Sequence, residues 1–79
     1  MKVPRDVDAG ELVKLLERCG YTTIRQTGSH IRMNKKLDDR EHDITVPNHK
    51  PIKIGTLQGI AKDVCFNNNF SIADFYAQL

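Results

Sequence analysis

A helical spacing of apolar residues comes first along the chain. Leucine, valine and cysteine side chains recur every three or four residues from Leu12 to Cys19, which is the spacing of one buried helix face. Asp8 followed by Glu11 has the pattern of a capping box, and Gly20 is the residue type that ends helices in a left-handed conformation. These positions predict a first helix over residues 8–19.

Three runs with the character of β-strands follow, at residues 21–27, 29–34 and 42–46, with a polar loop over 35–41. Pro47 ends the third run because it has no N–H to donate to a neighbouring strand. The alternation assigns one set of side chains to the core: Ile24, Ile31, Met33, Ile44 and Val46. It assigns another set to the opposite face: Thr23, Arg25, Thr27, His30, Arg32, Asp43 and Thr45.

The last third of the chain has helical patterns again. Residues 56–65 predict a second helix capped by the Thr56 hydroxyl, and residues 67–69 form a connection. Ser71 and Asp74 predict the cap of a short C-terminal helix. The order α-β-β-β-α, plus this last helix, predicts an α+β fold with a three-stranded antiparallel sheet and helices packed on one face.

Length and composition limit the class of protein. The 79 residues predict a single domain, 1–79, and the net charge of +2 does not select a partner. No apolar run approaches the ~18 residues of a membrane span, and the first residues lack the apolar core of a signal peptide. We therefore expect a soluble cytoplasmic protein with no membrane partner. Cys19 and Cys65 have neither zinc nor disulfide spacing, which predicts reduced thiols.

The open face of the predicted sheet carries the candidate chemistry. Arg25, His30 and Arg32 together are a plausible seat for a phosphodiester, and residues 44–62 contain Lys50, Lys53 and Lys62 without any acidic residue. From the pattern alone, an ordinary surface histidine and a solvated basic face remain the simpler interpretation.

Two other chemistries fit the sequence poorly. A zinc site built from His30, His42, Asp43 and His49 lacks the usual ligand spacing, so we expect no metal. A serine hydrolase using Ser29 with His30 is disfavoured, because neighbours on a strand point to opposite faces.

Residues 25–30 read RQTGSH, and residues 45–57 read TVPNHKPIKIGTL. The first run resembles the glycine-serine-histidine signature of the HicA family of toxins, and the second run is similar to that family's second signature. The start of the chain, from Pro4 to Tyr21, also resembles the family. Three departures are the acidic loop at 38–41, Gly59 in the second helix and the asparagine run at 67–69.

The resemblance implies a double-stranded-RNA-binding-like fold and metal-independent, cofactor-free cleavage of messenger RNA (mRNA), restrained by a HicB-type antitoxin. It makes His30 the catalytic residue, with Gly28 and Ser29 as the structural part of the signature. An imidazole is suited to this chemistry because it exchanges protons near neutral pH.

Supporting roles follow from charge. We expect Arg32, with Arg25 or Lys50, to stabilise the phosphorane, and His49, Lys50 and Lys53 to contact RNA or a partner. The alternation places neither His42 nor His49 beside His30, so a second proton-transfer group is not identified. The alternative function is a non-catalytic RNA- or protein-binding module of the same fold.

Overall fold

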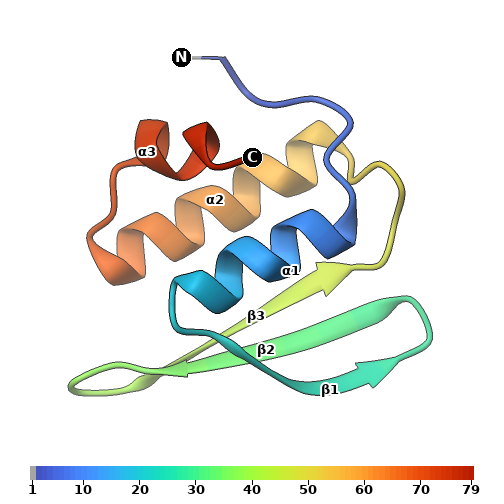
Figure 1. The fold of residues 1–79 in the computed structure, drawn as a ribbon. Helices are drawn as coiled ribbons and strands as arrows, with labels where there is room; N and C mark the ends of the chain where they lie inside the picture. The colour runs from blue at the N-terminus through green and yellow to red at the C-terminus, as the bar shows by residue number, and fades with distance from the viewer. Residues whose placement is uncertain (1) are drawn as a thin grey trace.

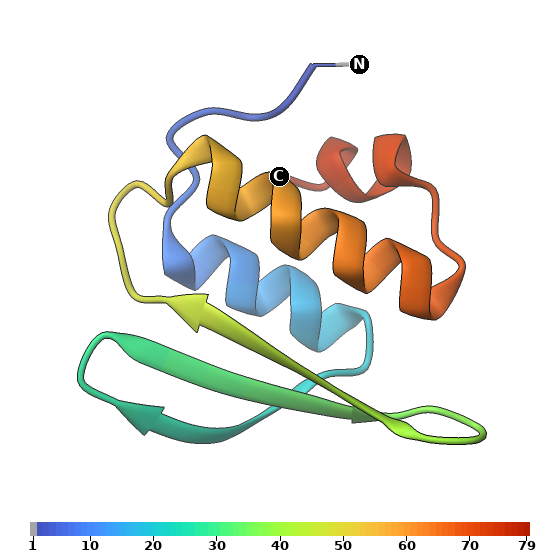
Figure 2. The ribbon, with the colours of Figure 1, turned by 180° about the vertical axis from the view of Figure 1, so that it is seen from behind.

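The computed structural model describes residues 2–79, so Met1 of the predicted domain lies outside the described residues. The elements follow in the order α1 (Ala9–Arg18), β1 (Thr22–Thr27), β2 (His30–Lys36), β3 (Glu41–Pro47), α2 (Ile54–Asn68) and α3 (Ile72–Ala77). The strands form one antiparallel sheet in the order β1-β2-β3. Helices α1 and α2 lie over one face of it and the other face is open (Figures 1 and 2). The predicted α+β layout is confirmed.

Both ends of α1 use the predicted capping residues. The Glu11 backbone N–H donates to the Asp8 carboxylate at 2.8 Å, which completes the capping box. Gly20 adopts φ +103°, and the backbone N–H of Tyr21 then reaches the Leu16 carbonyl at 3.0 Å. This is a Schellman ending, in which a residue without Cβ reverses the chain and delivers it into β1.

The core lies between the sheet and the two long helices. Four of the five strand residues predicted to face inward are buried there: Ile31, Met33, Ile44 and Val46. Strands β2 and β3 extend beyond their predicted limits at the hairpin between them. β2 continues to Lys36 and β3 begins at Glu41, so the loop contains only residues 37–40. None of the helices within residues 2–79 combines the length and apolar character that crossing a membrane requires.

The prediction for Ile24 is wrong. Its side chain is 56% exposed, because the pairing register of β1 shifts between Thr23 and Arg25. An extra residue in one strand reverses the alternation beyond it. Thr23 is therefore the Cα partner of buried Met33, on the helix side rather than the open face, while Arg25 and Thr27 keep their predicted side.

The predicted limits of α2 are also wrong. The helix begins at Ile54, and Lys53 is its N-cap residue. No side chain caps this end of the helix, so the predicted cap by the Thr56 hydroxyl is wrong. It continues through Asn68 and ends where Asn69 takes a left-handed φ of 57°. Asparagine tolerates that conformation better than most residues, so the asparagine run forms the last turn of α2 and its end. The Ser71 cap of α3 is confirmed.

Candidate nucleic-acid interface

His30 is the first residue of β2 and its side chain is exposed. Gly28, in the turn before it, has φ +52°, a conformation that suits glycine because it has no Cβ. The Cα partners of His30 are Thr27 on β1 and Pro47 on β3, so the imidazole lies at the end of the central strand, flanked on both sides. The open side of the sheet thus presents a histidine to solvent, as predicted.

Two arginines share this open face. Arg32 lies two residues along β2 from His30, which corresponds to roughly 7 Å along the strand. Its Cα partner on β1 is Arg25, and both arginines are exposed. Residues directly opposite one another in an antiparallel pair lie on one face. The structure therefore places on one face the three residues that the sequence suggested as a seat for a phosphodiester.

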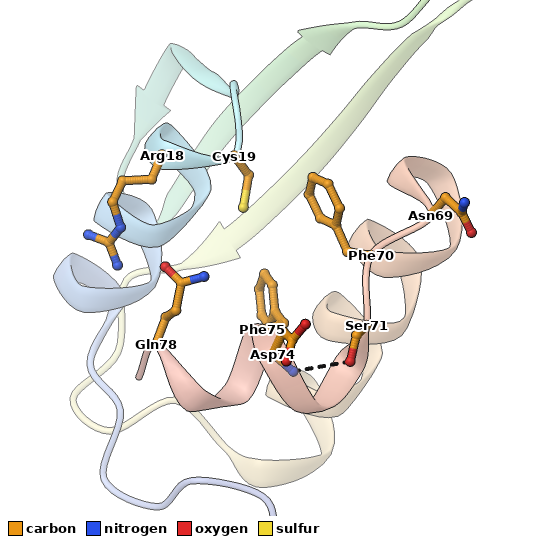
Figure 3. Close-up of a pocket in the computed structure, with 8 residues that line it drawn as sticks. All are labelled: Arg18, Cys19, Asn69, Phe70, Ser71, Asp74, Phe75 and Gln78. Atoms are coloured by element: carbon orange, nitrogen blue, oxygen red, sulfur yellow. Dashed lines mark hydrogen bonds between the residues drawn. The ribbon is translucent and has the colours of Figure 1, made fainter.

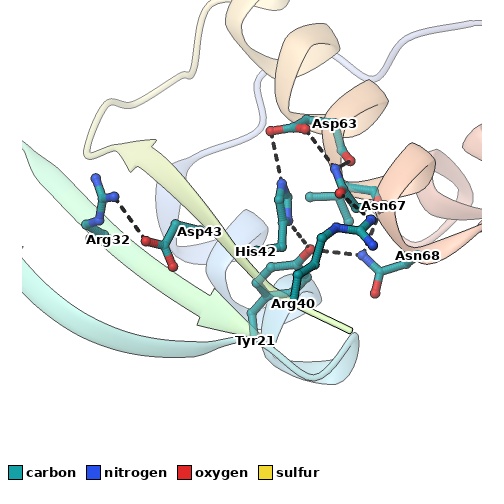
Figure 4. A network of polar contacts seen from close by, with 9 residues as sticks. Tyr21, Arg32, Arg40, His42, Asp43, Asp63, Asn67 and Asn68 are labelled. Carbon is teal, nitrogen blue, oxygen red and sulfur yellow. Dashed lines mark hydrogen bonds and ion pairs between the residues drawn. The ribbon is translucent and has the colours of Figure 1, made fainter. Parts of the chain in front are cut away.

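A carboxylate accompanies one of these arginines (Figure 4). The Arg32 Nη2 donates to Asp43 Oδ2 at 3.0 Å, and the Asn34 amide donates to Asp43 Oδ1 at 2.6 Å. The hydrogen bond from Asn34, and then that from Arg32, lower the pKa of the Asp43 carboxyl. Asp43 is consequently a fixed negative charge on the otherwise basic part of the face.

The second signature segment meets the first at the His30 end of the sheet. The Asn48 backbone N–H donates to the Ser29 carbonyl at 2.7 Å, directly after Pro47 has paired with His30. The loop that follows is held to the start of α1, since Ala9 N–H donates to the His49 carbonyl at 3.2 Å. Three predicted contact residues on or beside this loop are exposed: His49, Lys50 and Lys53.

His42 lies on the other face of the sheet, in a polar chain that sequence reasoning missed (Figure 4). Its Nδ1 lies 2.6 Å from the Tyr21 hydroxyl, and its Nε2 lies 3.2 Å from Asp63 Oδ2 on α2. The Asn68 amide donates to the Tyr21 oxygen at 2.9 Å, so one continuous chain of polar contacts joins Asn68, Tyr21, His42 and Asp63. With 11% of its side chain exposed, His42 ties β3 to α2.

The structure does not assemble the zinc set considered from the sequence. His42 and its neighbour Asp43 lie on opposite faces of β3, and His30 is at the far end of the sheet from His42. Across residues 2–79, no three histidine, cysteine or acidic side chains are grouped in a way that suits a metal ion.

A cavity of about 400 Å³ opens elsewhere, between the end of α1 and α3 (Figure 3). Arg18 and Cys19 line it from α1, and Phe70 and Phe75 from the α3 side. It lies at the opposite end of α1 from the loop that holds His49. No residue predicted to act on RNA borders it. Cys19 and Cys65 are free thiols as expected, and burial raises the pKa of both.

Comparison with known protein families gives a match. The family model described as "HicA toxin of bacterial toxin-antitoxin" matches residues 9–64. That segment includes both signature runs and every residue assigned here to catalysis or RNA contact. No curated protein and no solved structure matches the chain.

Proposed function

The chain belongs to the HicA family of bacterial toxins, and from that premise we propose that this toxin of a toxin–antitoxin system cuts messenger RNA, with His30 as its acid–base catalyst. The observation that carries the proposal is the position of the His30 imidazole. It is exposed on the open sheet face, two strand residues from Arg32 and flanked by the loop of the second signature.

The chemistry uses the nucleophile that RNA already contains. The His30 imidazole takes the proton of a 2′-hydroxyl, the 2′-oxygen bonds to the adjacent phosphorus, and the bond from phosphorus to the 5′-oxygen breaks. The leaving 5′-oxygen then receives a proton from water, and His30 returns the proton that it took to the solvent. The products are a 2′,3′-cyclic phosphate and a 5′-hydroxyl. DNA lacks the attacking group and is not a substrate.

Cations beside His30 supply the charge stabilisation. Negative charge grows on the phosphorane oxygens during the step, and guanidinium groups placed there in advance lower its energy. Arg25 and Arg32 occupy opposite positions on neighbouring strands, next along the sheet from His30. We assign them to the phosphate at the cleavage site.

The loop after β3 extends the interface along the RNA backbone. His49, Lys50 and Lys53 are exposed at the sheet end that holds His30, and no acidic residue occurs from position 44 to 62. Lysine contacts of this kind add affinity without sequence preference and weaken as salt rises. We assign these three residues to phosphates flanking the cleavage site.

A toxin of this family has an antitoxin partner, and we propose a HicB-type protein that covers the open sheet face. Such a cover removes His30 from solvent and blocks RNA sterically. Acidic side chains on the antitoxin would pair with Arg25 and Lys50 as phosphates do. Because its mRNA substrate is cytoplasmic, we place the toxin in the cytoplasm.

The test is digestion of a defined RNA by the purified full chain. We expect cutting in the presence of EDTA, a 2′,3′-cyclic phosphate on the upstream product, and no cutting at a nucleotide whose 2′-hydroxyl is replaced by hydrogen. Persistent cutting at the deoxy position excludes the 2′-hydroxyl mechanism. Tight RNA binding by the wild type without any product favours the non-catalytic binding module.

A further inference from the structure

The arginine nearest to His30 along β2 already has an anionic partner. Arg32 Nη2 lies 3.0 Å from Asp43 Oδ2 (Figure 4). The Asn34 amide donates to the other carboxylate oxygen at 2.6 Å. Asn34 is the Cα partner of Asp43, so the sheet register fixes the carboxylate beside the arginine. By contrast, no ion pair among residues 2–79 involves Arg25.

This ion pair is open to exchange. The side chains of Arg32 and Asp43 are 50% and 40% exposed, so water reaches both partners. Exposed ion pairs are weak, and a guanidinium binds a carboxylate and a phosphate through the same forked donors. A phosphate arriving beside His30 therefore offers Arg32 a replacement for Asp43.

We propose that Asp43 is a positioning residue that occupies Arg32 in the free protein and competes with the RNA phosphate for it. The inference rests on the proposed function, because it assigns Arg32 to a backbone phosphate of the substrate. Asp43 then lowers the affinity for RNA. Arg25 and Arg32 then contribute unequally to RNA affinity, because Arg25 binds phosphate without a competing carboxylate.

Binding to an RNA that cannot be cut isolates this effect from catalysis. The probe is a fluorescent single-stranded oligonucleotide with 2′-O-methyl groups throughout, titrated with the full chain at physiological salt. Asp43→Asn is expected to tighten Kd by about 2- to 5-fold, the range that exposed ion pairs support. Asp43→Glu retains the carboxylate and is expected to stay within about twofold of the wild type.

Two controls separate competition for Arg32 from a general change of charge. Glu41→Gln removes the same charge from the same strand and face, and no ion pair of the described residues involves Glu41. The gain in RNA affinity from Glu41→Gln is expected to be less than half that from Asp43→Asn. Glu41 does not pair with Arg32, and dissolved salt screens the interaction between separated charges over about 8 Å. The second control adds Asp43→Asn to a protein that already has Arg32→Gln. There the gain in RNA affinity is expected to be no larger than the gain from Glu41→Gln in the wild type.

Kinetics on cleavable RNA distinguish competition for Arg32 from a purely structural role of Asp43. Competition predicts that Asp43→Asn lowers KM while kcat stays within about twofold, since Asp43 acts on phosphate binding rather than on proton transfer. A structural role predicts instead a lower denaturation midpoint and a lower kcat.

The failures of the two proposals are distinguishable. If Asp43→Asn binds no better than Glu41→Gln, or binds more weakly than the wild type, competition for Arg32 is overturned while cleavage by the wild type stands. If the wild type and all variants neither bind nor cut RNA, both proposals are wrong.

Discussion

The Asn48 backbone N–H donates a 2.7 Å hydrogen bond to the Ser29 carbonyl oxygen, next to His30. This bond joins two segments that are separated along the chain but share the proposed interface. It continues the pairing of β2 with β3 beyond Pro47, whose nitrogen has no hydrogen to donate. The loop with His49 and Lys50 is thereby fixed beside the end of β2.

Removing that donor should loosen the loop. Asn48→Pro is expected to lower the free energy of unfolding by about 0.5–1.5 kcal/mol, the usual worth of one hydrogen bond, and to reduce RNA cleavage. Asn48→Ala keeps the N–H and serves as the matched control, with cleavage near the wild-type rate. Urea denaturation and RNA digestion measure the two effects. Equal cleavage by both variants would show that the bond does not organise the interface.

The chain of polar contacts from Tyr21 to Asp63 should be important for stability. Tyr21→Phe leaves His42 Nδ1 without its partner in a nearly dry site, and we expect a loss of about 1–3 kcal/mol in unfolding free energy. Tyr76 is also buried but has no hydrogen bond of its hydroxyl among the described residues, so Tyr76→Phe is the control and should cost less. Similar losses of unfolding free energy in the two variants would show that the polar contacts of Tyr21 do not stabilise the fold.

The same tyrosine predicts a dependence on alkaline pH. Burial raises the pKa of Tyr21 above its ordinary value of 10.0. The folded state therefore retains the phenol proton where the unfolded state releases it. The associated stability is complete below pH 10 and is lost as pH rises through the raised pKa. Chemical denaturation from pH 8 upward should show a smaller loss in Tyr21→Phe than in the wild type; equal slopes would contradict this.

How far the sequence determines the fold is clearest on β1. The alternation was correct for Ile31 and Met33 on β2, because a paired central strand keeps its period of two. It failed at Ile24, since a bulge depends on how β1 pairs with β2 and leaves no mark in the pattern of β1 alone. The limits of α2 were missed for a different reason. Ile54 and Asn68 continue the spacing of Leu57, Ala61 and Val64, but Thr56 was interpreted as the cap and residues 67–69 as a connection because of their residue types.

The exposure of Ile24 can be tested by substitution. Ile24→Thr should change the free energy of unfolding by less than about 0.5 kcal/mol, as an exposed surface position does. Met33→Ala, at a position with no exposure, should cost about 2–5 kcal/mol. Urea denaturation of the two variants decides the point. A cost for Ile24→Thr comparable with that of Met33→Ala would place Ile24 in the core.

Two glycines should respond to alanine with opposite signs. Gly28 has φ +52° and open space where a Cβ would lie, so Gly28→Ala should destabilise by about 1–2 kcal/mol through backbone strain alone. Gly59 lies within α2, also with open space, so Gly59→Ala should stabilise by about 1 kcal/mol. Thermal or urea denaturation measures both. A stabilising Gly28→Ala would contradict the left-handed turn before His30.

The site was predictable to the extent that it follows local periodicity. Arg25, His30 and Arg32 reached the open face because alternation places side chains two apart on one side. The Arg32–Asp43 pair was not predicted, because it depends on the register between β2 and β3. Alternation with Ile44 and Val46 does put His42 on the inner face, but its partner Asp63 comes from a distant helix.

The central claim is that the His30 imidazole transfers protons in RNA cleavage, and single-turnover digestion of one RNA by three matched proteins tests it most directly. His30→Ala should cut about 10²–10⁴-fold more slowly than the wild type, with an unchanged denaturation midpoint because the side chain is exposed. His49→Ala, which removes another exposed histidine of the same interface, should retain far more activity. A His30→Ala protein that cuts at the wild-type rate would contradict the account.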